Sequence, residues 1–173
     1  MSILELIKTR RSIRAFTDEP VPDEVLRQLV EAACWAPTAS NMQSWQFVAV
    51  RDRDNMRKLK RFSPGLFVLP SALIVICVDK DRASAKGGGM ARDLLSLCEV
   101  SMAAQNIMLT AHSFGLGTCV IRSFDQEAFR VLLELPPNIV PELLVTVGYP
   151  KVVPRAPERR PLGEVLHFEN WGR

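Results

Sequence analysis

The residues best suited to chemistry form a basic cluster near the N-terminus. Three arginines and one serine stand within five residues, at the end of a predicted helix: Arg10, Arg11, Ser12 and Arg14. Guanidinium groups and a hydroxyl at this spacing can donate several hydrogen bonds to one phosphate. The cluster therefore predicts a pocket for a phosphate-bearing ligand.

Two further segments could complete such a pocket. The polar loop PTASNMQSWQF, residues 37–47, leads directly into a predicted strand, and its hydrogen-bonding groups suit the edge of a heteroaromatic ring. A tail that carries several prolines can fold back over the body of the protein, and it brings three more arginines: Arg155, Arg159 and Arg160.

Side chains for self-contained catalysis are scarce. The two histidines, His112 and His167, occur without an HExxH motif or a GxSxG elbow, so we expect neither a metal site nor a serine hydrolase. We interpret His112 as a structural residue with a satisfied hydrogen bond. The four cysteines form no CxxC pair, and we expect them to be buried free thiols: Cys34, Cys77, Cys98 and Cys119.

Two glycine-rich segments do not match nucleotide fingerprints. Residues 86–90, KGGGM, lack the GK[ST] ending of a triphosphate loop. Residues 115–120, GLGTCV, have two of the three glycines of a dinucleotide motif and run from a helix into a strand, which is the reverse of the required order. We interpret both segments as turns.

The composition is that of one soluble domain. The chain has 173 residues and a net charge of +3. Its longest apolar run, Ala72–Val78, is too short to cross a bilayer, and no signal peptide is recognisable. Residues 52–61 place acids before bases, which favours a solvated helix over a nucleic-acid patch. We expect a cytoplasmic protein with no nucleic-acid or membrane partner.

Hydrophobic spacing and capping signals predict the elements that position these residues. The helix at 93–114 is apolar nearly all round, so we expect it to be buried. In chain order the predicted elements are a helix opened by a Ser2–Glu5 capping box, a helix from Pro22 that ends before Pro37, a strand at 45–51, a helix at 52–61, a buried strand at 72–78, the helix at 93–114, a strand at 118–121, a helix from a Ser123–Gln126 capping box to about Leu135, a strand at 143–148 and an irregular tail from Tyr149.

Five ordered motifs resemble the nitroreductase superfamily of enzymes that depend on flavin mononucleotide (FMN). The resemblance covers nearly the whole chain. It rests on RRSIR at residues 10–14, the loop at 37–47, AAQN at 103–106 running into GLGTC at 115–119, LLVTVGYP at 143–150 and RRPL at 159–162.

The resemblance implies an α+β fold with a mostly antiparallel central sheet flanked by helices. It implies a single domain, residues 1–173, whose C-terminal extension from about residue 149 to 173 wraps the partner subunit of an intertwined homodimer. The FMN sites of such a dimer lie at the interface. The implied activity is an FMN-dependent oxidoreductase that passes hydride from NADH or NADPH, through flavin N5, to a nitroaromatic, a quinone or another conjugated acceptor.

The resemblance also implies which residues bind the cofactor, while the chemistry itself is carried by FMN, with no catalytic side chain. Phosphate and ribityl contacts fall to Arg10, Ser12 and Arg14, with Arg11 beside the ring and Arg159 and Arg160 completing the phosphate pocket. The partner subunit would supply Pro37, Thr38, Ala39 and Asn41, with Gln43 in the same set. The segment Val120, Ile121, Arg122 and Ser123 would pass along the flavin, with a backbone N–H near N5.

The sequence departs from the family pattern at two places. Ser44 stands where proline usually precedes the tryptophan, and Arg122 and Ser123 stand where a glycine, or an acid followed by glycine, is usual. The second departure favours an alternative, a non-catalytic flavin-binding or sensor protein on the same fold. A weaker alternative is a basic interaction module that uses residues 51–61.

Overall fold

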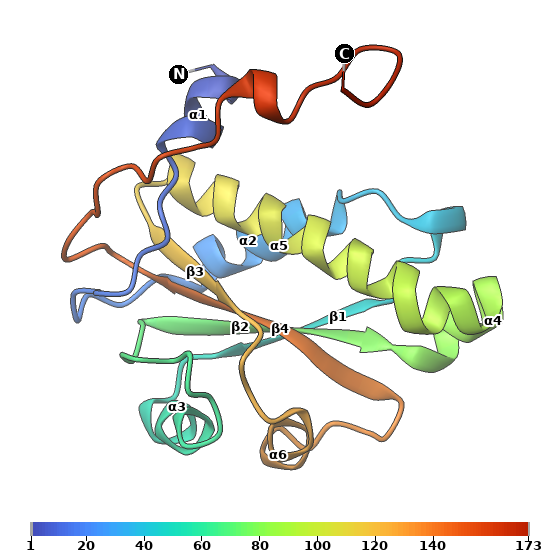
Figure 1. Ribbon diagram of the computed structural model, residues 1–173. Coiled ribbons are helices and arrows are strands. Elements are labelled where there is room, and N and C mark those ends of the chain that lie inside the picture. Colours follow the sequence, from blue (N-terminus) through green and yellow to red (C-terminus); the bar gives the residue numbers. More distant parts are fainter. Residues whose placement is uncertain (1, 173) are drawn as a thin grey trace.

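A four-stranded antiparallel sheet forms the centre of the part of the chain that the computed structural model describes, residues 2–172. The strand order is β1-β2-β4-β3, so β1 and β3 are the edge strands (Figure 1). This is the predicted antiparallel sheet. The strands are β1 (Trp45–Val50), β2 (Ala72–Asp79), β3 (Gly117–Ile121) and β4 (Ile139–Gly148).

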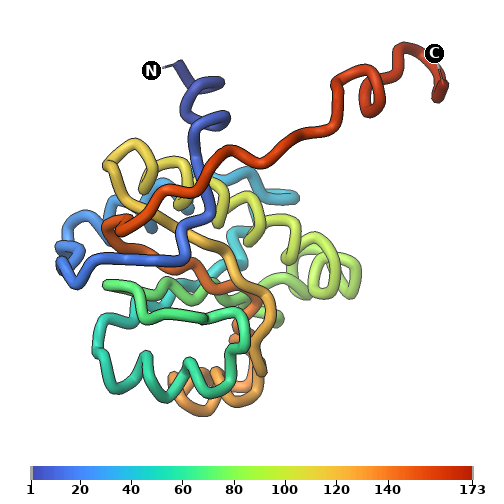
Figure 2. Tube along the Cα trace, turned by 60° about the vertical axis from the view of Figure 1, so that its left-hand side comes forward, coloured from blue at the N-terminus to red at the C-terminus, as the bar shows by residue number. Residues whose placement is uncertain are grey.

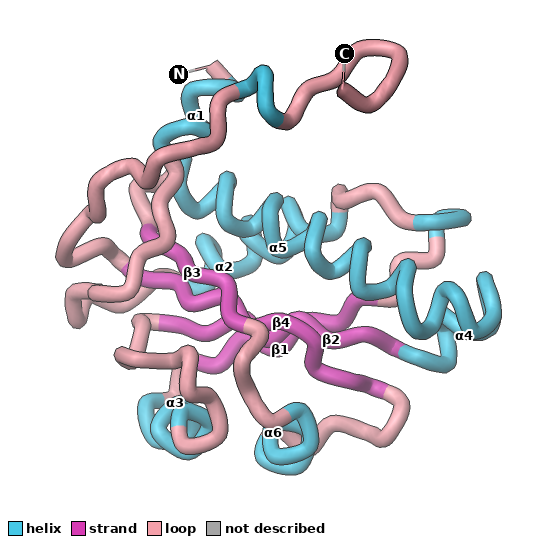
Figure 3. Tube along the Cα trace, viewed as in Figure 1, coloured by secondary structure: helices cyan, strands magenta, loops and turns pink. Residues whose placement is uncertain are grey.

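Helices cover both faces of the sheet (Figure 3). On one face lie α2 (Asp23–Cys34) and α5 (Ser96–Ser113), and on the other lie α3 (Arg53–Lys60) and α6 (Gln126–Leu132). The residues of β2 alternate between these two cores, Ile74 and Ile76 in one and Leu73 and Val75 in the other. Such a strand is apolar on both faces, as the sequence predicted for residues 72–78.

Local signals set most helix starts. The Ser2 hydroxyl and the Glu5 carboxylate form the predicted capping box of α1 (Ile3–Thr9). Asp52 accepts a hydrogen bond from Asn55 N–H at 2.7 Å and begins α3. The capping box predicted at Ser123 is wrong, because the Asp125 carboxylate accepts from Ala128 N–H instead, and α6 ends at Leu132.

The region before α5 differs from the prediction. A helix, α4 (Lys80–Met90), follows β2, and a π-helical turn, η2 (Ala91–Leu95), joins it to α5, which begins at Ser96 rather than Asp93. The predicted turn at 86–90 is a break within this helical stretch, where Gly88 has a φ of 64°. Asp79 caps α4 by accepting from Arg82 N–H at 3.0 Å.

The long helix is not buried on all sides within one chain. Val100, Ala103 and Ile107 lie in the core against the sheet, whereas Leu94 and Met102 are exposed. The prediction of buried thiols is wrong for Cys34 and Cys98, which are exposed because they lie on outward faces of α2 and α5. Residues 80–113 form the one described helical stretch long and apolar enough to span a membrane. The apolar residues of this stretch that face the core pack on the sheet, which explains why they are apolar.

The chain after Tyr149 leaves the sheet. It contains one short 3-10 turn, η3 (Leu162–Glu164), and is otherwise irregular, as its prolines predicted. Figure 2 shows this tail extending away from the sheet and its helices. Large apolar side chains along it are exposed, among them Val153, Phe168 and Trp171.

Candidate functional site

The basic segment 10–14 lies along the open edge of β3. Ser12 forms a parallel bridge with Thr118, and Ile13 N–H donates to Thr118 O at 2.8 Å. Gly117 makes this approach possible, because a Cβ there would lie 2.7 Å from the Ile13 side chain. The glycine of the strand thus fixes where the arginines stand.

The two arginine clusters of the sequence meet beside this edge. They line one groove of about 330 Å³, formed by Arg10, Arg11, Ser12, Arg14, Pro154, Arg155, Pro157 and Arg159. No acidic side chain lines it. Five guanidinium groups without a counter-charge create a strongly positive field, which an anion would neutralise.

One of these guanidinium groups has a buried nitrogen that lacks a partner. Arg10 Nη1 is shielded from solvent and makes no hydrogen bond to any described residue. By contrast, Arg11 Nη1 donates to Lys8 O at 2.6 Å and to Arg10 O at 2.8 Å. A buried donor without an acceptor costs about 1–3 kcal/mol. Arg10 therefore fits a ligand oxygen, and the groove fits the phosphate of FMN.

Arg160, predicted for the phosphate pocket, and His112, predicted as a structural residue, do not line the groove. Arg160 is directed to Glu164, with Nε 3.2 Å from the carboxylate. His112 Nε2 lies 2.9 Å from Thr9 Oγ1, so its interpretation as a structural histidine is confirmed. Burial, together with the charges of Arg10 and Arg11, lowers the pKa of His112.

The outer edge of β3 continues past the basic segment. Because backbone groups alternate along a strand, Val120 N–H faces the same side as Thr118, whose carbonyl accepts from Ile13. No partner for Val120 N–H occurs among residues 2–172 in the backbone pairings. Val120 is 40% exposed, whereas Ile121 is buried. A planar ligand could therefore approach the Val120 backbone.

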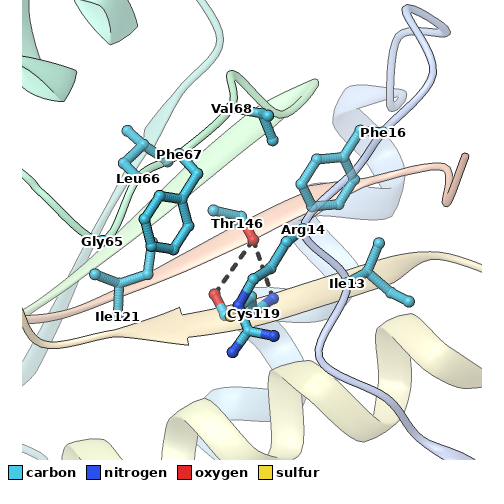
Figure 4. Close-up of a pocket in the computed structure, with 10 residues that line it drawn as sticks. All are labelled: Ile13, Arg14, Phe16, Gly65, Leu66, Phe67, Val68, Cys119, Ile121 and Thr146. Atoms are coloured by element: carbon cyan, nitrogen blue, oxygen red, sulfur yellow. Dashed lines mark hydrogen bonds between the residues drawn. The ribbon is translucent and has the colours of Figure 1, made fainter. Parts of the chain in front are cut away.

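A small cavity lies behind this edge, between β3 and the loop at residues 65–68 (Figure 4). Its volume of about 10 Å³ has room for about one water molecule. Thr146 Oγ1, in its wall, accepts from Cys119 N–H at 3.0 Å and lies 3.2 Å from Cys119 O. The loop packs closely here, since a Cβ on Gly65 would lie 2.4 Å from Ser123 Oγ. The cavity is part of the support for β3, too small for a cofactor.

The polar loop lies far from the groove within one chain. Ala39 N–H donates to Glu99, near the start of α5, whereas Thr9 contacts His112, near its end. Thirteen residues of helix separate these two contacts, about 20 Å. The loop and the basic segment therefore occupy opposite ends of α5 (Figure 1), and one chain does not bring together the two halves of the predicted site.

Comparison with known proteins identifies the family. The model of the Nitroreductase family matches residues 7–68 and 64–149. The chain belongs to the nitroreductase family.

Relatives within the nitroreductase family match this chain over almost its whole length. A protein of Methanothermobacter thermautotrophicus, provisionally named NADH dehydrogenase/NAD(P)H nitroreductase, is 34% identical over 99% of this chain and 88% of its own. The FMN reductase (NADPH) of Bacillus subtilis is 31% identical over 97% of this chain and 74% of its own. A crystal structure of a Clostridium difficile nitroreductase family protein has a TM-score of 0.85, with 27% identity over 98% of this chain and 99% of that one.

Arg122, at a departure from the nitroreductase pattern, is held by an ion pair. Its Nη2 lies 3.2 Å from Glu142, and its guanidinium lies 5.7 Å from the centre of the Phe124 ring. Glu142 also accepts from Lys80 Nζ at 2.9 Å and from Gln126 Nε2 at 3.1 Å. The Arg122 side chain thus has partners on β4 and in the segment just before α6, so its presence does not by itself favour the sensor alternative.

Sequence reasoning missed Glu99. Glu99 is 1% exposed, and its carboxylate contacts the polar loop. Burial raises its pKa, and hydrogen bonds from Ala39 and Ser44 oppose that rise. A single acidic residue on the core-facing side of an apolar helix was the signal that could have revealed it.

Proposed function

We propose that this chain is an FMN-dependent oxidoreductase that uses NADH or NADPH to reduce a conjugated acceptor, such as a nitroaromatic compound or a quinone. The observation that carries the proposal is the groove of arginines, with its unpartnered Arg10 donor, beside the open edge at Val120. The names of relatives in the family, including an FMN reductase and an NADPH-flavin oxidoreductase, support the same cofactor and electron donors.

Each part of the groove has a role in holding the cofactor. Arg10, Arg14 and Arg159 would bind the phosphate, and Ser12 would add a hydroxyl. The Val120 N–H would donate to the edge of the ring. When bound, FMN would supply the redox chemistry, a hydride transfer from the nicotinamide to the acceptor. The protein would hold the ring in place and shield one face from water.

The second half of each site would come from a partner subunit. We propose a homodimer in which the loop containing Pro37, Thr38, Ala39, Asn41 and Gln43 reaches the groove of the other chain. The exposed apolar side chains of α5 and of the tail support this arrangement, because a monomer would leave them in water. Residues 1–173 would then form one domain whose extension at 149–173 wraps the partner of a cytoplasmic enzyme.

Two measurements test the proposed activity. The purified protein should show flavin absorbance in the visible range, and NADH or NADPH should bleach it without oxygen. A nitroaromatic compound or a quinone should then restore the absorbance. Bound flavin that neither dinucleotide reduces would refute the enzyme and favour a flavin sensor, and a protein that cannot bind FMN would refute both.

A further inference from the structure

One buried carboxylate on α5 accepts hydrogen bonds from the polar loop at two positions. Glu99 Oε1 accepts a hydrogen bond from Ala39 N–H at 2.9 Å, and Glu99 Oε2 accepts from Ser44 Oγ at 3.2 Å. Ser44 is fully buried, and Glu99 is 1% exposed. The segment between these two contacts, residues 40–43, includes Asn41 and Gln43, two of the predicted flavin contacts.

The segment needs such an anchor because its own backbone is strained. Ser40, Asn41 and Gln43 all have a φ of about 50°, a conformation that side chains other than glycine rarely adopt. Strained residues of this kind persist only where the surroundings fix them. Before β1 begins at Trp45, regular structure in the loop is limited to one 3-10 turn, η1 (Ala39–Asn41). Inside the loop, Gln43 Nε2 donates to Asn41 Oδ1 at 2.7 Å, and Met42 N–H donates to Ala39 O at 3.0 Å. The hydrogen bonds that hold the loop from outside come from β2, α4 and α5.

Other contacts hold the second half of the loop. Arg82 Nε donates to Met42 O at 2.7 Å, and Asp79 N–H donates to Ser44 O at 2.7 Å. The Glu99 carboxylate adds the contact to Ala39, at the start of the strained stretch. Burying a carboxylate is costly unless several donors satisfy it, so this side chain is better explained by the loop it binds than by packing.

We propose that Glu99 is a positioning residue for the flavin: by fixing the loop through Ala39 and Ser44, it sets the conformation that Asn41 and Gln43 present to the cofactor of the partner subunit. This inference rests on the proposed function. It also accounts for Ser44, at the place where proline is usual in the family, because a proline has no hydroxyl to donate to Glu99.

Substitutions at Glu99 separate positioning from packing. Glu99→Ala should weaken FMN binding on the order of tenfold, which corresponds to about 1.4 kcal/mol, and should speed amide exchange at Ala39. Glu99→Gln should keep an FMN affinity and an exchange rate at Ala39 close to those of the parent. Its side-chain carbonyl can accept from Ala39 N–H, and its NH₂ group can donate to Ser44 Oγ. Ser44→Ala, a milder change, should weaken FMN binding by less than Glu99→Ala does.

Ser96→Ala is the matched control. Ser96 is fully buried one turn earlier on the same helix, where its hydroxyl donates to Arg92 O at 2.8 Å without contacting the loop. This variant should lose thermal stability and keep the FMN affinity of the parent. The dissociation constant would be measured by quenching of FMN fluorescence, amide exchange by mass spectrometry and stability by thermal unfolding.

The outcomes distinguish this inference from the proposed function. A parent protein that does not bind FMN refutes the proposed function. A parent that binds FMN, with Glu99→Ala and Ser44→Ala equal to it in affinity and amide exchange, refutes only the positioning role. Equal losses of affinity in Ser96→Ala and Glu99→Ala would also refute it, because the effect would then be general destabilisation. If Glu99→Ala does not fold, Ser44→Ala decides.

Discussion

The Arg10 guanidinium should have opposite effects on stability with and without FMN. Its Nη1 is buried and unpaired, in a groove that four other arginines share. Arg10→Met keeps most of the aliphatic stem and removes the charge and the donors. Without FMN, the substitution relieves an unsatisfied donor and like-charge repulsion. With FMN, it removes the hydrogen bonds that the phosphate would accept.

The expected changes in stability and in FMN affinity follow from the donor that is relieved and the hydrogen bonds that are lost. Relief of one buried unpaired donor should stabilise the flavin-free protein by about 1–3 kcal/mol. Loss of one charge-assisted hydrogen bond costs about 1.5–3 kcal/mol of binding free energy, so FMN affinity should fall about 10- to 150-fold. The flavin-loaded variant should accordingly gain less stability from a given excess of FMN than the parent does.

Unfolding in urea measures the stability of the flavin-free protein and the stability gained when FMN binds. Quenching of FMN fluorescence gives the affinity directly. Arg160→Met is the control, because Arg160 already pairs with Glu164 and does not line the groove. Arg160→Met should change neither the stability of the flavin-free protein nor its FMN affinity appreciably. A flavin-free Arg10→Met protein that is less stable than the parent, or one that binds FMN as tightly, would refute the assignment of Arg10 to the phosphate.

Four further predictions test other parts of the protein. Cofactor released from the purified protein should run as FMN in chromatography, because the groove suits one terminal phosphate; FAD would contradict this. Sedimentation at micromolar concentration should show a dimer, and a monomer with stoichiometric flavin would rule out shared sites. FMN binding should raise the pKa of His112 in an NMR titration, because burial, Arg10 and Arg11 lower that pKa and a phosphate would neutralise the arginines; an unchanged pKa would place the phosphate elsewhere. Stability of the parent should fall as the pH rises above the ordinary pKa of a glutamate, since burial raises the pKa of Glu99 in the folded state, and Glu99→Gln should lack this part of the pH dependence.

The local structure of this protein could be predicted from the sequence where the cause is itself local. The unbroken apolar run at 72–78, which is short and rich in β-branched residues, predicts a central strand because a strand of a sheet covered on both faces is apolar at every position. Ser2 and Asp52 predict helix starts because a cap and its amide lie within three residues of each other. The same reasoning failed at Ser123, where a competing acid two residues later took the cap.

The family motifs extended the prediction to the site, but the tertiary structure decided how the site is assembled. The tail places Arg159 in the same groove as Arg10, and Arg160 turns away to Glu164. Glu99 meets Ala39 across 60 residues of sequence. Helical periodicity places Glu99 on one side of a helix but does not say which loop packs there. Whether a charged side chain is paired, buried alone or free depends on contacts between segments distant in the chain, and these exist only once the sheet has brought the segments together.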